Sequence, residues 1–210
     1  MSRQSLIYRH ILLYRFMMNV LYGGKYKARF EAVISQLKVL PIKDAAILEL
    51  CFGDTYIADW CIKAGYTWKG IDINQHFVSE ARKHGYDAYF EDLSLGEALP
   101  QANVCVMMGS LYHFHPNEYS LLKKMFAAAT YVIISEPVSN LSSKKGVIGF
   151  LARRAANAGK GNEEFRYDTA SFLKTITTYS NELNYDILSS SHQGKDLIIT
   201  LTKRNGRSKD

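Results

Sequence analysis

The chain has 210 residues, 47% of them apolar and 22% charged, which suits one folded domain with a sizeable core and excludes a disordered chain. The formal net charge of +6 is uneven, because residues 1–30 hold six Lys or Arg and no acid, and residues 138–166 hold six against two acids. Basic segments beside an acidic remainder indicate an anionic partner at those segments, although solvated surface charge is an equally good explanation.

The N-terminal region predicts two helices, which together form a helical cap over residues 1–40. In the first, Leu6–Tyr22, charged residues interrupt the apolar run and no small-residue cleavage site follows, so neither a secretory signal nor a membrane span is indicated. Its apolar stripe either packs on the core or lies on lipid. The stripe consists of Ile7, Ile11, Tyr14, Met18 and Leu21. The second helix spans Arg29–Leu40 and ends before Pro41.

From residue 41 onward, strand-like apolar runs alternate with helix-like segments. The predicted strands are Ala45–Leu50, Thr67–Asp72, Asp87–Phe90, Ala102–Met108 and Thr130–Ser135. The predicted helices are Thr55–Ala64, Gln75–His84 and Asn117–Ala128. Alternation at this spacing is typical of right-handed βαβ units, so residues 41–137 are predicted to form an α/β core around a parallel sheet.

The remaining chain first breaks this pattern and then completes it. Residues 138–166 are predicted to form an inserted basic lid segment. Asp168 is a suitable N-cap for a helix over Thr169–Leu183, and two strands follow at Tyr185–Ser190 and Asp196–Thr202, joined by a hairpin loop at residues 192–195. Residues 167–203 therefore complete the same domain, and residues 204–210 form a tail. The expected fold class is α/β: a doubly wound, mostly parallel seven-stranded sheet with a terminal antiparallel hairpin.

The most informative stretch is Ala45–Trp60, AAILELCFGDTYIADW, which reads as strand, turn and helix. Glu49 lies near the end of the strand, and Gly53 lies in the turn, where glycine takes any backbone conformation at low cost. Such units bind nucleotide-like ligands at the carboxyl edge of a parallel sheet, where backbone N–H groups are exposed. Asp72 closes the next strand about twenty residues after the turn, where a carboxylate can accept both hydroxyls of a ribose.

These segments resemble the class I S-adenosylmethionine (SAM)-dependent methyltransferases, whose first motif is roughly acidic-x-Gly-x-Gly-x-Gly. Glu49, Gly53 and Asp72 match this family, whereas Cys51 and Thr55 stand where the first and third glycines would be. The resemblance continues in order through ED at residues 91–92, MGSLYHF at residues 108–114 and YVIISEP at residues 131–137. It implies a Rossmann-like methyltransferase fold, SAM as the cofactor and methyl transfer as the activity.

The resemblance also implies which residues contact the methionine and ribose portions of SAM. Gly53 would let the backbone approach the methionine portion. Glu49 would reach the ammonium group directly or through water. Asp54 would either contact that ammonium or cap the following helix. Asp72 would accept hydrogen bonds from the ribose.

Further cofactor contacts are expected around the adenine ring. Asp92 would accept a hydrogen bond from the adenine amino group, with Glu91 as the competitor for this role. Ile73 and Leu93 would sandwich the ring between them. Gly109 begins the loop after the fourth strand and is also assigned to the cofactor site.

The loop after the fourth strand, MGSLYHFH, is expected to run beneath the transferable methyl. His113 and Tyr112 are the candidate catalytic residues, because a titratable group there could deprotonate a hydroxyl or an amine. The alternative for His113 is a structural role. His113 and His115 have no identifiable third partner for a metal ion, so no metal is expected.

Acceptor contacts are expected from the sheet edge and from both basic regions. Tyr22 and Tyr26 either cover the cofactor and acceptor or pack the N-terminal helices. Glu136 would bind the acceptor or brace the inserted segment. Arg153 would attract an anionic acceptor. The expected function is therefore methyl transfer to a small or lipid-linked, anionic acceptor, with peripheral membrane contact as an open alternative.

Other classes of function fit less well. A nicotinamide-dependent oxidoreductase is disfavoured by the missing glycines, by Glu49 and by the terminal hairpin. A non-catalytic SAM-binding module would explain the missing glycines, but Asp72 and Asp92 argue for a working site. Nucleic acid is disfavoured as a partner, because the loop lacks the Asn/Asp-Pro-Pro-aromatic tetrad that stacks a flipped base. Three cysteines without metal-ligand spacing indicate buried thiols in a reducing cytoplasm.

Overall fold

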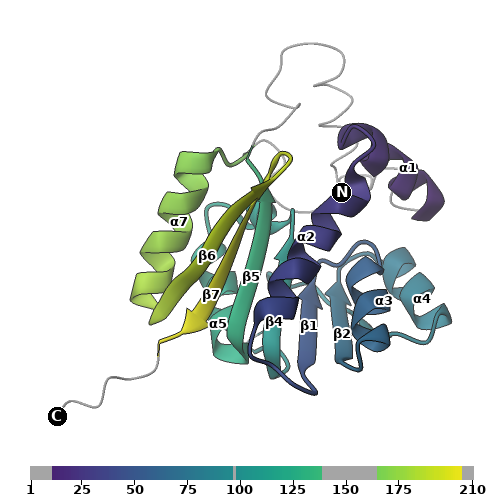
Figure 1. Cartoon of the computed structure of the whole chain (residues 1–210), viewed down its shortest axis with the longest axis horizontal. Coiled ribbons are helices and arrows are strands. Elements are labelled where there is room, and N and C mark those ends of the chain that lie inside the picture. The colour runs from purple at the N-terminus through teal and green to yellow at the C-terminus, as the bar shows by residue number, and fades with distance from the viewer. Residues whose placement is uncertain (1–10, 97, 139–164, 205–210) are drawn as a thin grey trace.

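A seven-stranded sheet lies at the centre of the computed structural model, which describes residues 11–96, 98–138 and 165–204 (Figure 1). The strand order is β3-β2-β1-β4-β5-β7-β6. The first five strands run parallel, and β7 runs antiparallel to both β5 and β6. The strands are β1 (Ala46–Leu50), β2 (Thr67–Asp72), β3 (Asp87–Phe90), β4 (Ala102–Met108), β5 (Ala129–Pro137), β6 (Tyr185–Gln193) and β7 (Asp196–Lys203).

This architecture confirms the fold class expected from the sequence, and β2, β3 and β4 have the predicted bounds. The terminal hairpin is tighter than expected. Its turn is only Gly194-Lys195, because His192 and Gln193 continue β6 and pair with Leu197 and Asp196. Gly194 takes a φ of +60°, a left-handed conformation that glycine adopts without a steric penalty.

Five helices cover the two faces of the sheet. On one face lie α2 (Tyr26–Val39), α3 (Tyr56–Lys63) and α4 (Gln75–Lys83), and on the other lie α5 (Glu118–Ala128) and α7 (Thr169–Glu182). The prediction that α2 starts at Arg29 is wrong by three residues. Tyr26 begins the buried stripe of α2, so packing on the core extends the helix toward its N-terminus.

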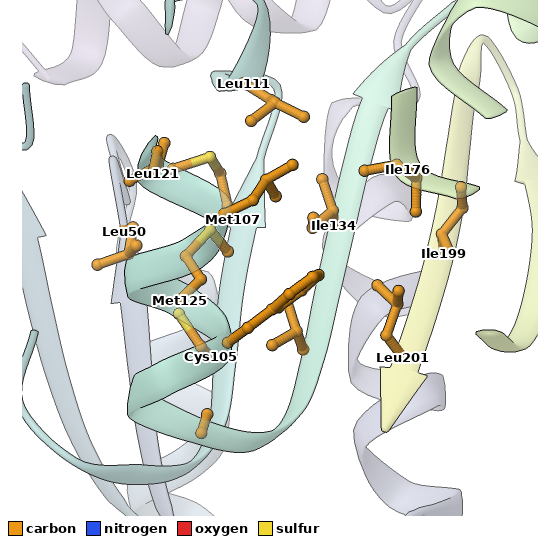
Figure 2. Packing of buried hydrophobic residues seen from close by; sticks show 14 of the residues in the cluster. Leu50, Cys105, Met107, Leu111, Leu121, Met125, Ile134, Ile176, Ile199 and Leu201 are labelled. Atoms are coloured by element: carbon orange, nitrogen blue, oxygen red, sulfur yellow. The ribbon is translucent and has the colours of Figure 1, made fainter. Parts of the chain in front are cut away.

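Both faces of the central strands are buried, and alternate residues of β1, β4 and β5 enter opposite cores. Along β1, Leu48 and Leu50 face α5, whereas Ile47 faces α2 and α3. Figure 2 shows the first of these cores, where side chains of β4, β5 and β7 meet those of α5 and α7. Cys61 and Cys105 are buried, Cys51 is half-buried, and all three thiols are free.

The described ends of the chain add local features. The predicted cap of α7 is confirmed, since the Asp168 carboxylate accepts a hydrogen bond from the Ser171 N–H at 2.7 Å. The helix α1 (Ile11–Leu21) lies near the carboxyl ends of the parallel strands (Figure 1). No helix among the described residues is long and apolar enough to cross a membrane. Most of the predicted basic lid, residues 139–164, lies outside the described residues.

A buried contact between β1 and β2 explains one glycine of the sheet. Gly70 pairs with Glu49, and the Trp68 indole of the same strand lies across Gly70. Its Nε1–H donates to Glu49 Oε2 at 2.8 Å. A Cβ atom on residue 70 would lie 2.1 Å from Trp68 Cη2. The absence of a side chain at Gly70 therefore lets the indole reach the carboxylate.

We expect Gly70→Ala to lower the free energy of unfolding by about 1–3 kcal/mol, because the added methyl overpacks the site and displaces Trp68. Denaturant unfolding measures this change. Thr67→Ala, at an exposed position of the same strand, is the control and should have a much smaller effect. Equal effects of the two substitutions would contradict the proposed packing.

Candidate functional site

The candidate site lies at the carboxyl edge of the sheet, where β1 sits between β2 and β4. The strand order reverses at this point, since the chain leaves β1 toward β2 on one side and later enters β4 on the other. Ligands of open α/β sheets bind at such switch points, because the loops on either side diverge there. Most of the residues expected to bind the cofactor come from the loops and strand ends around this point.

The turn after β1 needs left-handed backbone at two residues. Cys51 has a φ of +53° and Gly53 a φ of +57°. Cys51 thus takes the conformation that glycine adopts at least cost, in the place of the missing first glycine of the motif. The third expected glycine is Thr55, whose φ of −93° suits any residue. The turn is therefore formed with one glycine of the three.

Asp72 ties the end of β2 to this turn. Its Oδ2 accepts a hydrogen bond from the Gly53 N–H at 3.0 Å, and its Oδ1 accepts one from the Asn74 N–H at 2.7 Å. Burial raises the pKa of Asp72 to about 6, against the effect of these N–H donors. The Ile73 N–H also acts on this carboxylate, which has about four acceptor positions in all. Asp72 thus holds the turn in place and keeps acceptor capacity at the edge of the sheet.

The helix α1 lies directly over the turn. A Cβ atom on Gly53 would lie 3.0 Å from Tyr14 Oη, so a larger residue there would require the tyrosine to shift by a few tenths of an ångström. Arg15 chelates the fully buried Asp54, with Nη2 2.7 Å from Oδ1 and Nε 3.0 Å from Oδ2. Asp54 Oδ1 also accepts from the Thr55 N–H at 2.8 Å. Asp54 therefore binds α1, an interaction that the sequence analysis did not include.

A buried acid and a buried base each keep an atom without a partner at this edge, among the described residues. Glu49 Oε1 has no partner among the described residues, and burial raises the pKa of Glu49 well above its usual range. Arg29 of α2 donates from Nε to Asp196 Oδ2 at 2.9 Å, while its Nη2 is buried and unpaired within the described part of the chain. A Cβ atom on Gly109, which has a φ of +65°, would lie 2.7 Å from this Nη2.

Arg29 is a residue that the sequence analysis missed. It is the one charged residue of the buried stripe of α2, whose other members are Tyr26, Phe30, Val33 and Leu37. A single cation in an apolar helical stripe requires a buried partner, and this pattern could have identified it.

Glu136 supports the loop after β4. This fully buried carboxylate at the end of β5 accepts through Oε1 from the N–H groups of Ser110 and Leu111, at 2.7 and 2.6 Å. Its Oε2 has no partner among the described residues. Burial raises the pKa of Glu136 to about 8. Glu136 thus braces the loop that carries the candidate catalytic residues.

That loop forms a short 3₁₀ helix, η2 (Leu111–Phe114), which contains Tyr112 and His113 with their ring centroids 4.0 Å apart. His113 Nδ1 is buried without a partner among the described residues. Burial, together with the positive charge of Arg166, lowers the pKa of His113 to about 4. The Arg166 guanidinium lies 4.1 Å from the centre of the Tyr112 ring. His113 is therefore neutral near pH 7.

His115 has a different environment from His113. Its Nδ1 lies 2.7 Å from Glu118 Oε1, and its ring stacks on Phe165 with centroids 3.7 Å apart. The same Glu118 oxygen accepts from Tyr167 Oη at 2.7 Å. His115 thus joins the loop to residues 165–167. Within the described ranges, no three His, Cys, Asp or Glu side chains converge as metal ligands do.

The residues expected around adenine follow β2 and β3. Asp92 Oδ1 accepts two hydrogen bonds from Ser94, one from its backbone N–H at 3.1 Å and one from its hydroxyl Oγ at 2.6 Å. Leu93 is buried in the core beside α5, and its carbonyl accepts from Lys124 Nζ at 2.6 Å. Ile73, at the end of β2, is half-buried.

The N-terminal tyrosines divide between packing and polar roles. Tyr26 is 3% exposed and packs against Tyr14, Phe30 and Tyr56. Tyr22 Oη donates to Asp196 Oδ1 at 3.0 Å. The residue directly over Gly53 is thus Tyr14, which the sequence analysis placed only in an apolar stripe. Arg153 lies outside the described residues.

No family model matches the sequence, and no curated protein matches it. Several solved structures, in contrast, are similar to this chain. Magnesium protoporphyrin IX methyltransferase from Synechocystis, with bound SAH, is 14% identical with a TM-score of 0.62, covering 89% of this chain and 85% of that one. A SAM-dependent methyltransferase from Methanosarcina mazei is 17% identical with a TM-score of 0.60, covering 80% and 97%.

A third similar structure is the complex of the Haloferax volcanii Trm112 methyltransferase activator with a methyltransferase. The two sequences are 10% identical and the TM-score is 0.68, and the match covers 97% of this chain and 100% of that chain. At such low identities these matches establish the fold alone. The chain therefore has the fold that these methyltransferase structures share.

We expect Glu136→Ala to lower the free energy of unfolding by about 1–3 kcal/mol for each of the two N–H groups left without an acceptor. Glu136→Gln keeps an acceptor oxygen and should change stability by less than about 1 kcal/mol. Denaturant unfolding of the two variants at one pH distinguishes them. Equal losses would show that the two N–H groups do not depend on Glu136.

The stability of the wild type should also depend on pH through Glu136. Its pKa rises from the ordinary 4.5 to about 8, so the folded state binds more protons between these values. The free energy of unfolding therefore falls as the pH rises through this window. The slope should be shallower in Glu136→Gln, and an unchanged slope would contradict the shift. Chemical denaturation between these pH values measures both slopes.

Proposed function

We propose that this chain is a SAM-dependent methyltransferase that binds SAM at the carboxyl edge of the sheet. The observation that carries this proposal is a pair of buried atoms without partners among the described residues: Glu49 Oε1 of β1, and Arg29 Nη2, which lies beside Gly109 after β4. Buried polar atoms without a partner are rare in proteins, and an acid and a base near one another suit the two ends of a zwitterion. The amino-acid end of SAM supplies an ammonium for Glu49 and a carboxylate for Arg29.

The neighbouring residues fit the rest of the cofactor. The backbone at Gly53 allows close approach beside Tyr14. Asp72, with a pKa of about 6, is largely ionised at pH 7 and would accept from the ribose hydroxyls through its remaining lone pairs. Asp92 lies past the end of the adjacent strand β3, where it would accept from the adenine amino group. An ammonium beside Glu49 would favour the ionised form of that buried carboxylate.

When bound, SAM supplies a methyl group that is already activated for displacement, so the protein mainly orients the acceptor. We assign this task to the loop of Tyr112 and His113. His113 is neutral near pH 7 and has an unpaired Nδ1, so it would accept a proton from an acceptor hydroxyl or amine. Glu136 fixes the loop through the N–H groups of Ser110 and Leu111, which keeps His113 in place.

The acceptor that we propose is anionic, either a small molecule or a lipid-linked one. Arg166 supports this proposal, because its guanidinium lies over the Tyr112 ring and its charge acts on His113. A cation at this position would attract an anionic acceptor toward the neutral histidine. The basic segment of residues 138–166, with Arg153, would add to the same attraction.

We expect the wild type to bind SAM, and Asp72→Ala to weaken this binding by about 1–3 kcal/mol, or roughly 5- to 150-fold, through loss of charge-assisted hydrogen bonds. Isothermal titration calorimetry measures both. The control Asp87→Ala lies at the opposite, amino end of the sheet and should leave affinity unchanged. Binding of NADH with no binding of SAM would overturn the proposal in favour of an oxidoreductase.

SAM affinity should also fall as the pH drops below about 6, because protonated Asp72 cannot accept from both ribose hydroxyls. The dependence should be weaker in Asp72→Ala. Thermal unfolding without ligand at each pH confirms that the protein remains folded. An affinity that is constant from pH 7 to pH 5 would remove Asp72 from the ribose site.

We expect His113→Ala to lower kcat by about 100-fold or more, with little change in SAM affinity. Because the pKa of His113 is about 4, its contribution to kcat should be constant between about pH 6 and pH 8. His192→Ala, at an exposed position of β6, is the control. Retention of full kcat by folded His113→Ala would assign this histidine a structural role. Steady-state turnover with an acceptor found by screening with labelled SAM provides the measurement.

A further inference from the structure

The helix α1 has two apolar faces, and the fold uses only one of them. Ile11, Tyr14 and Met18 pack against the core that also contains α2, α3 and α4. On the other side, Leu12 is 74% exposed, Leu13 40%, Phe16 64% and Val20 57%. At about 100° per residue these four side chains occupy an arc of about 100°, the width of the apolar face with which a surface helix usually meets a partner. We call Leu12, Leu13, Phe16 and Val20 the outer face of α1.

This outer face is unusual within the described part of the chain. It holds four of the twelve large apolar side chains that are exposed there, all on one helix of eleven residues. Asn19 lies about 20° outside this arc, next to Leu12. A helix that is apolar on both sides is normally buried on both sides or lies at a membrane surface. The tertiary fold accounts for the inner face and leaves the outer face to be explained.

The charge around α1 selects the occupant of this face. Residues 1–30 contain six Lys or Arg and no acid, and the first acid of the sequence is Glu31. Arg15 and Arg29 pair with the buried carboxylates of Asp54 and Asp196, which leaves four basic residues in this segment. A second copy of the chain packed on this face would bring two such basic regions together, which disfavours self-association. An anionic lipid surface suits both the apolar face and the basic charge. Its acyl chains receive the apolar side chains, and its head groups attract the cations.

We propose that the outer face of α1 docks on an anionic lipid bilayer. The position of α1 gives this docking a consequence, since Tyr14 lies over Gly53 and Arg15 chelates Asp54. A bilayer on the outer face would therefore lie beside the carboxyl edge of the sheet, where α1 is seen in Figure 1. This inference rests on the proposed function: if the chain transfers a methyl group, the placement favours an acceptor carried by the membrane over one free in solution.

The test uses the full chain and two sets of vesicles, one of phosphatidylcholine and one with about one third phosphatidylserine. We expect the wild type to sediment with the anionic vesicles, and to do so less as salt is added. Leu12→Ser/Phe16→Ser should reduce the partition constant for vesicle binding by at least about tenfold, because two apolar side chains no longer enter the bilayer. Val39→Ser/Ile62→Ser is the control, since both residues are exposed but lie on α2 and the end of α3.

Three results would overturn the docking proposal: no sedimentation of the wild type with anionic vesicles at low salt, equal losses in the two double variants, or a wild-type dimer that Leu12→Ser/Phe16→Ser dissociates in analytical ultracentrifugation. Calorimetry with SAM separates this proposal from the proposed function. Leu12→Ser/Phe16→Ser should retain wild-type SAM affinity, which also shows that it folds. A wild type that binds vesicles and not SAM would support the docking and overturn the proposed function.

Discussion

The site depends on one repeated interaction, in which a carboxylate at the end of one strand accepts N–H groups from the loop of the neighbouring strand. Asp72 of β2 binds the Gly53 N–H after β1, and Glu136 of β5 binds the Ser110 and Leu111 N–H groups after β4. Parallel strands end at the same edge, so each strand end lies beside its neighbour's loop. Buried carboxylates need such donors, and loops need such acceptors, so each carboxylate fixes a loop that regular strand pairing leaves unsupported.

The N-terminal helices complete the charge balance of this edge. Arg15 of α1 pairs with Asp54, and Arg29 of α2 pairs with Asp196, in both cases with a carboxylate that is fully buried. Removing one partner of such a pair leaves an uncompensated buried charge, which typically costs about 3–5 kcal/mol. The N-terminal helices therefore belong to the site as much as the sheet does. The atoms that still lack partners among the described residues, including Glu49 Oε1 and Arg29 Nη2, lie in the same region, as expected for a surface that binds a charged ligand.

The incomplete glycine motif has a simple explanation in the backbone. Left-handed conformations occur at Cys51 and Gly53, and at Gly53 a Cβ atom would also lie only 3.0 Å from Tyr14 Oη. At Cys51 only the conformational strain remains, of order 1–3 kcal/mol. Thr55 begins a helix with ordinary backbone angles. Glycine is thus retained at the position where both the conformation and the limited space favour it, which is why a weak sequence motif still forms the turn.

The sequence by itself determined the fold class and much of the order of its elements, and it predicted the sheet edge at which we propose that SAM binds. Apolar runs bounded by turn residues located β2, β3 and β4, and the cap at Asp168 is a contact between residues three apart. The roles of Tyr14, Arg15, Arg29 and Glu136 were decided only by the tertiary structure. Their contacts join residues from different elements, such as Arg15 with Asp54 and Arg29 with Asp196. Local periodicity shows that a side chain is buried, but only the packing of distant elements decides which charge or N–H group it meets.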